Sequence, residues 1–279
     1  MSKIAVIGIV GNSVFLPVER FHVGGETVEA HDIHFEPGGK GFNQAVAAAR
    51  FGAEVAFLGA VGEDFFATAD AFLKKEGIDS HLILKQEKKT AFAAIVTDES
   101  GANRVTVYQG AELTAEDVSY FSENIRTADI LLLNNEVPEA VNLAAVKIAK
   151  EAGVYVILNP APARETDGYI LDSVDLFTPN EHETLGIENK KNVIVTLGKR
   201  GSRDCESGEV IPPFDFGFAV DTTGAGDTFS GVLSAAIAEG ESKRRAIILA
   251  TAASSLGVTK KYAVSSIPNR DEIFEKIQK

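Results

Sequence analysis

The sequence predicts an α/β fold in which helices cover both faces of a central, mostly parallel sheet, with a small β-sheet beside it. Three observations predict it. Short apolar stretches alternate with longer helix-like stretches along most of the chain. The apolar stretches are continuous, as expected of strands that are buried on both faces. Two further segments alternate polar and apolar residues, which is typical of strands with one face in water.

The strands and helices of the main layer follow one another in order. Strands are expected at residues 4–10, 54–59, 130–133, 154–158, 176–178 and 193–196. Helices are expected at residues 42–51, 65–76, 138–152, 225–239 and 244–256. Gly52, Gly77 and Gly153 each follow one of these helices directly, where a left-handed residue commonly ends a helix.

The two alternating segments are residues 26–35 and 91–108, the second with a turn around residues 99–101. One wet face favours antiparallel pairing. We expect a lid built from about residues 12–35 and 88–110, on a single domain that spans residues 1–279. Only about a dozen residues follow Asn180 before the next strand, and a parallel crossover needs a dozen or more, so the helix there is shortened or missing.

Composition excludes several classes of protein. A net charge of -13 argues against non-specific binding to nucleic acid or to anionic membranes. No apolar run approaches the ~20 residues that span a bilayer, and the N-terminus reads as a strand rather than a signal peptide. The single cysteine, Cys205, excludes an intrachain disulfide and fits a reducing cytosol. We therefore expect a cytoplasmic protein.

The strongest chemical signal is the segment FAVDTTGAGDTF, residues 218–229. A strand is expected to end at Val220, a turn with Gly224 and Gly226 follows, and a helix begins near Ala225. The free N–H groups of a first helical turn form an anion site. Beside a bound phosphate, Asp227 suits a base that accepts a proton from an attacking hydroxyl. From spacing alone, the alternative is an aspartate that only complements the helix dipole.

A second glycine-rich segment, GGKGFNQAVAAAR, covers residues 38–50. Gly38, Gly39 and Gly41 give a turn that a small ligand can approach closely. Asn43 lies in the first turn of the following helix and offers donors and an acceptor to sugar hydroxyls. A tight turn before an Ala-rich packing helix is the alternative interpretation.

Together with three shorter segments, these two motifs resemble the signatures of the ribokinase-like (pfkB) carbohydrate kinases. The shorter segments are LNPAPAR (158–164), TPNEHE (178–183) and VIVTLG (193–198), and all five stand in the family's order over nearly the whole chain. The resemblance implies a ribokinase-like fold and transfer of the ATP γ-phosphoryl group to a hydroxyl of a small sugar, a pentose such as ribose. It also implies Mg²⁺, activation by K⁺, and a homodimer formed through the lid.

The resemblance assigns roles to the residues that match the family's motifs. Asp227 becomes the base, with an anion hole made by Gly224, Ala225 and Gly226. The residues assigned to the sugar, together with Asp227, are Gly11, Ser13, Gly38, Gly39, Lys40, Asn43 and Glu136. Those assigned to the nucleotide are Asn180, Thr196, Gly198 and Gly201. Those assigned to metal ions are Glu183 for magnesium and Asp221, Thr223 and Ser266 for the monovalent cation.

The chain departs from the family after its first strand. Members that bind ribose usually carry Asn-x-Asp there, where the gapless match places Gly11 and Ser13. A one-residue shift restores Asn12 but puts Val14 at the Asp position. Either way a carboxylate that clamps two hydroxyls is absent, at a cost of ~1.5–3 kcal/mol for a substrate that presents them.

Other readings therefore stay open. The acceptor could be a nucleoside, fructose or a sugar acid instead of a pentose. A catalytically idle protein that binds a sugar or a nucleotide is an alternative from another functional class, because fold alone does not separate the two. In the cation segment, Tyr262 stands where the family often has glycine.

Overall fold

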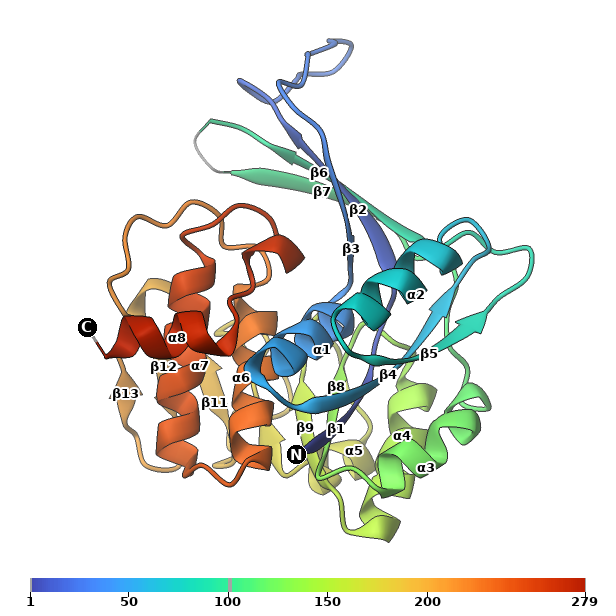
Figure 1. Cartoon of the computed structure of the whole chain (residues 1–279), viewed down its shortest axis with the longest axis vertical. Coiled ribbons are helices and arrows are strands. Elements are labelled where there is room, and N and C mark those ends of the chain that lie inside the picture. The colour runs from blue at the N-terminus through green and yellow to red at the C-terminus, as the bar shows by residue number, and fades with distance from the viewer. Residues whose placement is uncertain (1, 100–101, 279) are drawn as a thin grey trace.

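The structure, a computed structural model, describes residues 2–99 and 102–278. Over these ranges the centre is a sheet of six strands in the order β10-β9-β8-β1-β4-β5 (Figure 1). The strands are β1 (Lys3–Ile7), β4 (Glu54–Val61), β5 (Asp79–Leu84), β8 (Ile130–Asn134), β9 (Tyr155–Asn159) and β10 (Leu176–Phe177). All of their pairings are parallel, which confirms the predicted sheet.

Helices cover both faces of this sheet because successive strand residues point to opposite sides. Val6 and Phe57 pack into one core and Ile7 and Leu58 into the other. The first core is closed by α1 (Lys40–Phe51), α2 (Phe66–Lys75), α6 (Ala225–Ala238) and α7 (Lys243–Gly257), with α8 (Arg270–Ile277) against α7. The second core is closed by the 3-10 turn η1 (Asp117–Phe121) with α3 (Ser122–Arg126), α4 (Glu139–Ala152) and α5 (Gly168–Ser173).

The lid is a second sheet that projects from the central layer (Figure 1). In the described part of the chain its order is β3 (His34–Gly38), β2 (Gly11–Pro17), β6 (Ala91–Thr97) and β7 (Asn103–Tyr108). The outer pairs are antiparallel as predicted, but the central pair β2–β6 is parallel, so the expectation of a purely antiparallel lid is wrong. Strand β2 follows β1 and strand β6 follows β5. Because β1 and β5 run in the same direction in the central sheet, β2 and β6 leave that sheet in the same direction.

The predicted strand at residues 26–35 is wrong over most of its length. The strand begins only at His34, and before it lies a loop held by one isolated bridge between Val18 and Ala30. The Glu26 carboxylate accepts hydrogen bonds from the Arg20 guanidinium and from the Val23 N–H, which closes the loop on itself. Alternation alone does not make a strand without a paired neighbour. The turn predicted around residues 99–101 lies partly outside the described residues.

A third, antiparallel sheet follows the central one along the chain. It consists, among the described residues, of β11 (Ile194–Thr196), β12 (Ser202–Asp204) and β13 (Val210–Ile211). Parallel bridges Phe177–Val193 and Asn180–Thr196 join β11 to the end of β10. Residues 181–192, all of them described, form turns and no helix, which confirms the predicted loss of the crossover helix.

Some elements escaped sequence analysis. Strand β5 carries polar residues at an edge of the sheet, and α8 is short and strongly charged. The signal for α8 was present, because Asn269 and Glu272 form a capping box. Over the residues that the structure describes, every helix is too short or too polar to cross a bilayer.

Candidate active site

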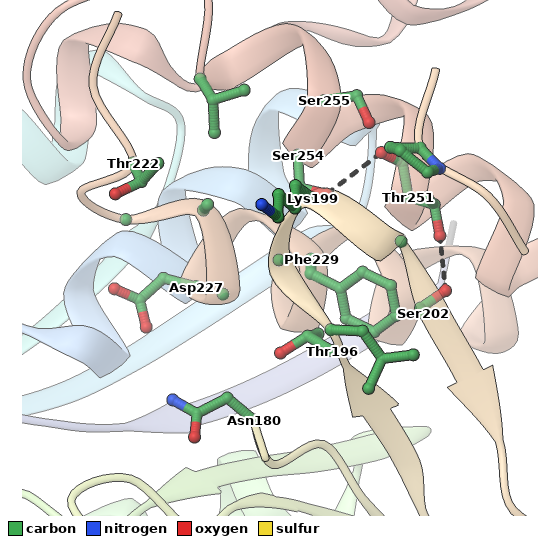
Figure 2. A pocket seen from close by; sticks show the side chains of 18 of the residues that line it. Asn180, Thr196, Lys199, Ser202, Thr222, Asp227, Phe229, Thr251, Ser254 and Ser255 are labelled. Carbon is green, nitrogen blue, oxygen red and sulfur yellow. Dashed lines mark hydrogen bonds between the residues drawn. The ribbon is translucent and has the colours of Figure 1, made fainter. Parts of the chain in front are cut away.

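A cavity of about 690 Å³ opens where the carboxyl ends of β9, β10 and β11 face the start of α6. The predicted residues that line it are Lys40, Asn180, Glu183, Thr196, Gly198, Gly201, Gly224, Ala225, Gly226 and Asp227. Figure 2 shows Asp227 and Asn180 toward one side of this cavity and the hydrogen-bonded pair Ser202 and Thr251 toward the other. The structure thus brings together residues that are far apart in the sequence.

The N-terminus of α6 faces this cavity. Gly224 precedes the helix with φ 76°, a left-handed conformation that glycine adopts without strain. The Ala225 N–H points back to the Thr222 carbonyl at 3.2 Å, so it is already engaged and is not a free donor as predicted. The Gly226 N–H has no hydrogen-bond acceptor among the described residues and remains available to an anion.

The Asp227 side chain, from the same helical turn, is only 6% exposed. Its two oxygens are held separately: Asn43 Nδ2 donates to Oδ2 at 2.9 Å and Gln44 Nε2 donates to Oδ1 at 3.2 Å. Burial raises the pKa of Asp227, while Lys40 and the two amide donors lower it, with the net shift upward. A carboxylate whose pKa is moved toward neutrality is a stronger proton acceptor than an exposed one.

Lys40 and Glu136 lie beside this carboxylate. The Lys40 N–H donates to Glu136 Oε2 at 2.6 Å. The Asp227 carboxylate raises the pKa of the Lys40 ammonium group, and Glu136 and Glu183 raise it further. Burial raises the pKa of Glu136 to about 7, with Lys40 opposing that shift. Lys40 therefore keeps its positive charge, and the Glu136 and Asp227 carboxyl groups beside it ionise at a higher pH than free carboxyl groups.

The lid strands meet α1 next to Asn43. Gly39 has φ 113° and lies against the Ile9 carbonyl, where no side chain fits. A Cβ on Gly38 would lie 3.1 Å from Ser13 Oγ and 3.9 Å from Asn43 Oδ1. Gly11 pairs with Gly38 across the two strands. These predicted sugar residues do not line the large cavity but adjoin it through Asn43, whose Oδ1 is buried with no hydrogen-bond partner in the described part.

Asn180 and Glu183 lie at the start of the loop after β10. The Asn180 N–H donates to Glu183 Oε2 at 2.9 Å, and the Asn180 amide oxygen accepts from the His182 N–H. Among residues 2–99 and 102–278, no three His, Cys, Asp or Glu side chains gather as a metal cluster. A single carboxylate at the cavity wall still fits Mg²⁺, which is usually held by one or two carboxylates plus substrate phosphates.

The residues predicted to hold a monovalent cation are brought only partly together. Asp221 Oδ1 accepts from the Thr223 N–H at 2.9 Å and from its hydroxyl at 2.7 Å, which places two hard oxygen ligands side by side. Asp221 Oδ2 accepts from the Tyr262 N–H at 2.9 Å, with Tyr262 at φ 73°. The Ser266 hydroxyl instead donates to the Ala263 carbonyl at 2.8 Å.

Glu36, on β3, is a buried carboxylate that sequence analysis missed. It accepts hydrogen bonds from three consecutive N–H groups and one hydroxyl, namely those of Ala263, Val264, Ser265 and the Ser265 side chain. Next to it the rings of His34 and Tyr262 stack with centroids 3.8 Å apart. The lid is therefore fastened to the segment that also binds Asp221.

Gln44 and Asn159 were also missed as site residues. Both stand inside motifs singled out above, one in GGKGFNQ and the other in LNPAPAR. Membership of those motifs was the only available signal, because the contacts of Gln44 with Asn159 and with Asp227 join residues more than a hundred positions apart.

Comparisons with known proteins agree with this geometry. Residues 1–270 match the family described as pfkB family carbohydrate kinase. The chain is 36% identical to a ribokinase of Lactococcus lactis subsp. lactis over 100% of its own length and 98% of the relative's. Among solved structures, a ribokinase from Thermotoga maritima gives a TM-score of 0.87 at 32% identity, with both chains fully covered. An Arabidopsis thaliana ribokinase, solved with ribose and ATP, gives 0.85 at 28%, again with both chains fully covered.

Proposed function

This chain belongs to the pfkB family of carbohydrate kinases, and from that premise we propose that it transfers the γ-phosphoryl group of ATP to a primary hydroxyl of a pentose, with ribose as the first candidate. Two comparisons support the choice of substrates. Curated relatives similar over their whole length are named ribokinase, and one similar structure contains ribose and ATP.

Asp227 acts as the general base in this proposal. Its carboxylate accepts the proton of the sugar hydroxyl while the hydroxyl oxygen forms a bond to the γ-phosphorus and the bond to the ADP oxygen breaks. Phosphoryl transfer has a loose transition state, so the fixed position of the carboxylate matters more than its basicity. Asn43 and the lid residues Gly11, Ser13, Gly38 and Gly39 orient the sugar beside it.

The nucleotide lies in the large cavity. The Gly226 N–H and the dipole of α6 face its terminal phosphates, and Lys40 adds positive charge at the same point. Thr196, Gly198 and Gly201 line the same cavity and would contact the nucleoside. When bound, Mg²⁺ neutralises charge on the phosphates, and Glu183 with Asn180 would hold it.

A monovalent cation is a finer part of the proposal. Asp221 and Thr223 would hold K⁺ beside the turn that precedes α6, where its charge stabilises the anion site. Turnover measured in potassium and in a buffer with a bulky organic cation tests this. Equal rates in the two buffers would remove K⁺ from the mechanism.

The observation that carries the function is a buried carboxylate on the first turn of α6, facing a nucleotide-sized cavity. Asp227→Asn keeps the shape and removes the base. We expect kcat to fall by about 10²–10⁴-fold with ATP binding retained. Turnover that survives this change would contradict the role of Asp227.

The lid gives one reason to keep other acceptors in view. Ser13 faces Gly38 at the sugar end, and neither it nor Gly11 provides a carboxylate for a pair of hydroxyls. ATP consumption should therefore be measured over pentoses, fructose, sugar acids and nucleosides. Ribose as the best acceptor supports the proposal, whereas binding without turnover across the whole set would favour a non-catalytic binding protein.

Assembly and location complete the proposal. The lid exposes apolar side chains, including Phe35, Val105, Val107 and Tyr108, and its outer strands have free edges within the described residues. Such edges invite pairing with another chain, which supports a homodimer formed through the lid. The single cysteine and the need for ATP support a cytoplasmic enzyme that works as one domain.

A further inference from the structure

Gln44 is a buried amide at the heart of the site that does not line the cavity. Its side chain is 0% exposed, and it lies on α1 next to Asn43. The Nε2 atom lies 3.2 Å from Asp227 Oδ1 and also 3.2 Å from Asn159 Oδ1. Because an amide nitrogen carries two hydrogens, one can go to each oxygen. A ligand in the cavity can therefore reach Asp227 but not Gln44.

The orientation of this amide is fixed by a chain of hydrogen bonds. Asn159 Nδ2 donates to the Thr178 carbonyl at 2.6 Å, which leaves the Asn159 oxygen facing Gln44. If Gln44 were flipped, its oxygen would face two acceptor oxygens, so only the observed orientation is favourable. The Thr178 hydroxyl forms a hydrogen bond with the hydroxyl of Ser230 at 2.9 Å, and Ser230 lies on α6, the helix that also carries Asp227.

The packing of α1 against α6 brings Gln44 to Asp227. Gly231 is the contact point: a Cβ there would collide with the Gln44 carbonyl oxygen and lie 2.6 Å from Ala47 Cβ. The two helices therefore approach as closely as their backbones allow. Gln44 reaches the first turn of α6 only because of this short separation.

We propose that Gln44 is the positioning residue for the base: it holds Asp227 Oδ1 in a fixed direction and stabilises the ionised carboxylate. The inference rests on the proposed function, in which Asp227 accepts the proton. Asn43 is assigned to the sugar and can share its donor with a substrate, whereas Gln44 is sealed from ligands. Gln44 therefore acts on the reaction only through Asp227.

Other charged groups also face Asp227. They are Lys40 on α1, Glu136 after β8 and Glu183 after β10. Substitution of Gln44 leaves all three in place. Because burial raises the pKa of Glu136 to about 7, the experiment is run both in the natural sequence and in a Glu136→Gln background, where that carboxyl group no longer contributes to the pH profile.

The test is the pH profile of kcat between pH 5 and 9. Gln44→Met removes the donor at similar volume, and loss of a hydrogen bond to the charged form should move the acid limb upward by about one pH unit. Gln44→Glu keeps the shape of the side chain and replaces the amide donor with a second carboxyl group. Two neighbouring carboxyl groups oppose each other's ionisation, so this variant should move the acid limb further upward. For Gln44→Met, KM for sugar and ATP should change less than about threefold, since no ligand contact is lost.

Ser234→Ala is the matched control. Its buried hydroxyl lies on α6 and, among the described residues, bonds only to the Ser230 carbonyl, at 2.7 Å, away from the cavity. This variant should lower the melting temperature without moving the acid limb. An acid limb that is unmoved in folded Gln44 variants, or that moves equally in Ser234→Ala, would overturn the inference. If Asp227 is not the base, Asp227→Asn retains turnover, so failure of the proposed function is distinguished from failure of this inference.

Discussion

The start of α6 and the lid face the same site from two sides, but they are built differently. Asp227 is 6% exposed and is held by two amides from a helix packed in the main core. Phe35 and Val107, on the lid, are each 56% exposed. The central strands are covered on both faces and the lid strands largely on one. The proposed base thus lies on the buried part of the molecule, whereas the exposed lid carries only some of the residues assigned to the sugar, Gly11, Ser13 and Gly38.

The lid is joined to the main layer at few points. Besides its own chain connections, the main joint is Glu36, which binds the N–H groups of residues 263–265. The rings of Phe15, His34 and Tyr262 pack around it. Few contacts mean a low free energy of local opening. A lid that opens locally can admit sugar and then exclude water, which would otherwise compete for the phosphoryl group.

The largest expected effect is a loss of unfolding free energy from a substitution in the core rather than in the lid. Phe57 is fully buried between the central sheet and α1, where it contacts Phe42 edge-on at 5.7 Å between centroids. Phe57→Ala should cost about 3–5 kcal/mol of unfolding free energy in a denaturant titration. Phe35→Ala on the lid is the control and, at concentrations where the chain is monomeric, should cost less than about 0.5 kcal/mol. Similar losses for both would end the contrast between the two regions.

A smaller effect is expected at the joint. Glu36→Gln replaces one acceptor oxygen with a donor that faces the Ser265 N–H, which should cost about 1–3 kcal/mol. This cost should appear as faster hydrogen exchange at residues 263–266 and a raised KM for sugar, with kcat little changed. Asp32→Asn, on the exposed loop before β3, is the control. A lower kcat with unchanged KM would show that the joint serves the base instead.

The third effect concerns association. Val107→Asp puts a charge on the exposed lid surface and should weaken the proposed dimer at least tenfold, about 1.4 kcal/mol. Sedimentation equilibrium measures the dissociation constant. Tyr120→Ser is the control, since Tyr120 is 77% exposed on η1. A chain that is monomeric at all concentrations, or a constant unmoved by Val107→Asp, would contradict dimerisation through the lid.

The smallest effect is electrostatic and belongs to the main layer. The raised pKa of Glu136, about 7 against an ordinary 4.5, means that the folded protein favours the neutral form, so this contribution to stability falls as pH rises from 4.5 and is fully lost just above pH 7. Between pH 6 and 8.5 the natural protein should lose about 1 kcal/mol from this group. Glu136→Gln should show no such loss in urea titrations at the two pH values. An equal loss of unfolding free energy in both proteins would mean that another group is responsible for the pH dependence.

Sequence alone predicted the central sheet well, because continuous apolar strands and glycine-ended helices are local signals. It predicted the turn at Gly224 and the helix that carries Asp227 for the same reason, but the strand predicted to end at Val220 is wrong, because residues 218–220 pair with no neighbouring strand and belong to no strand of the structure. It missed the contact between Gln44 and Asp227, 183 residues apart, which depends on how closely two helices pack. It missed Glu36 because that carboxylate's partners lie 227 to 229 residues away.

The lid was the least predictable element. Its central strand, Gly11–Pro17, has no regular alternation, and the segment predicted instead closes on itself through Glu26. Pairing between β2 and β6 is set by the direction in which the chain leaves the main sheet, which composition does not encode.

Gly231 does not line the cavity, yet the alignment of the proposed base depends on it. A side chain at this position would wedge α1 and α6 apart and withdraw both amides from Asp227 together. In a mutational scan scored by growth on the sugar, position 231 should therefore tolerate as few replacements as position 227. Directed evolution of a new acceptor preference has to leave this glycine alone and vary the lid.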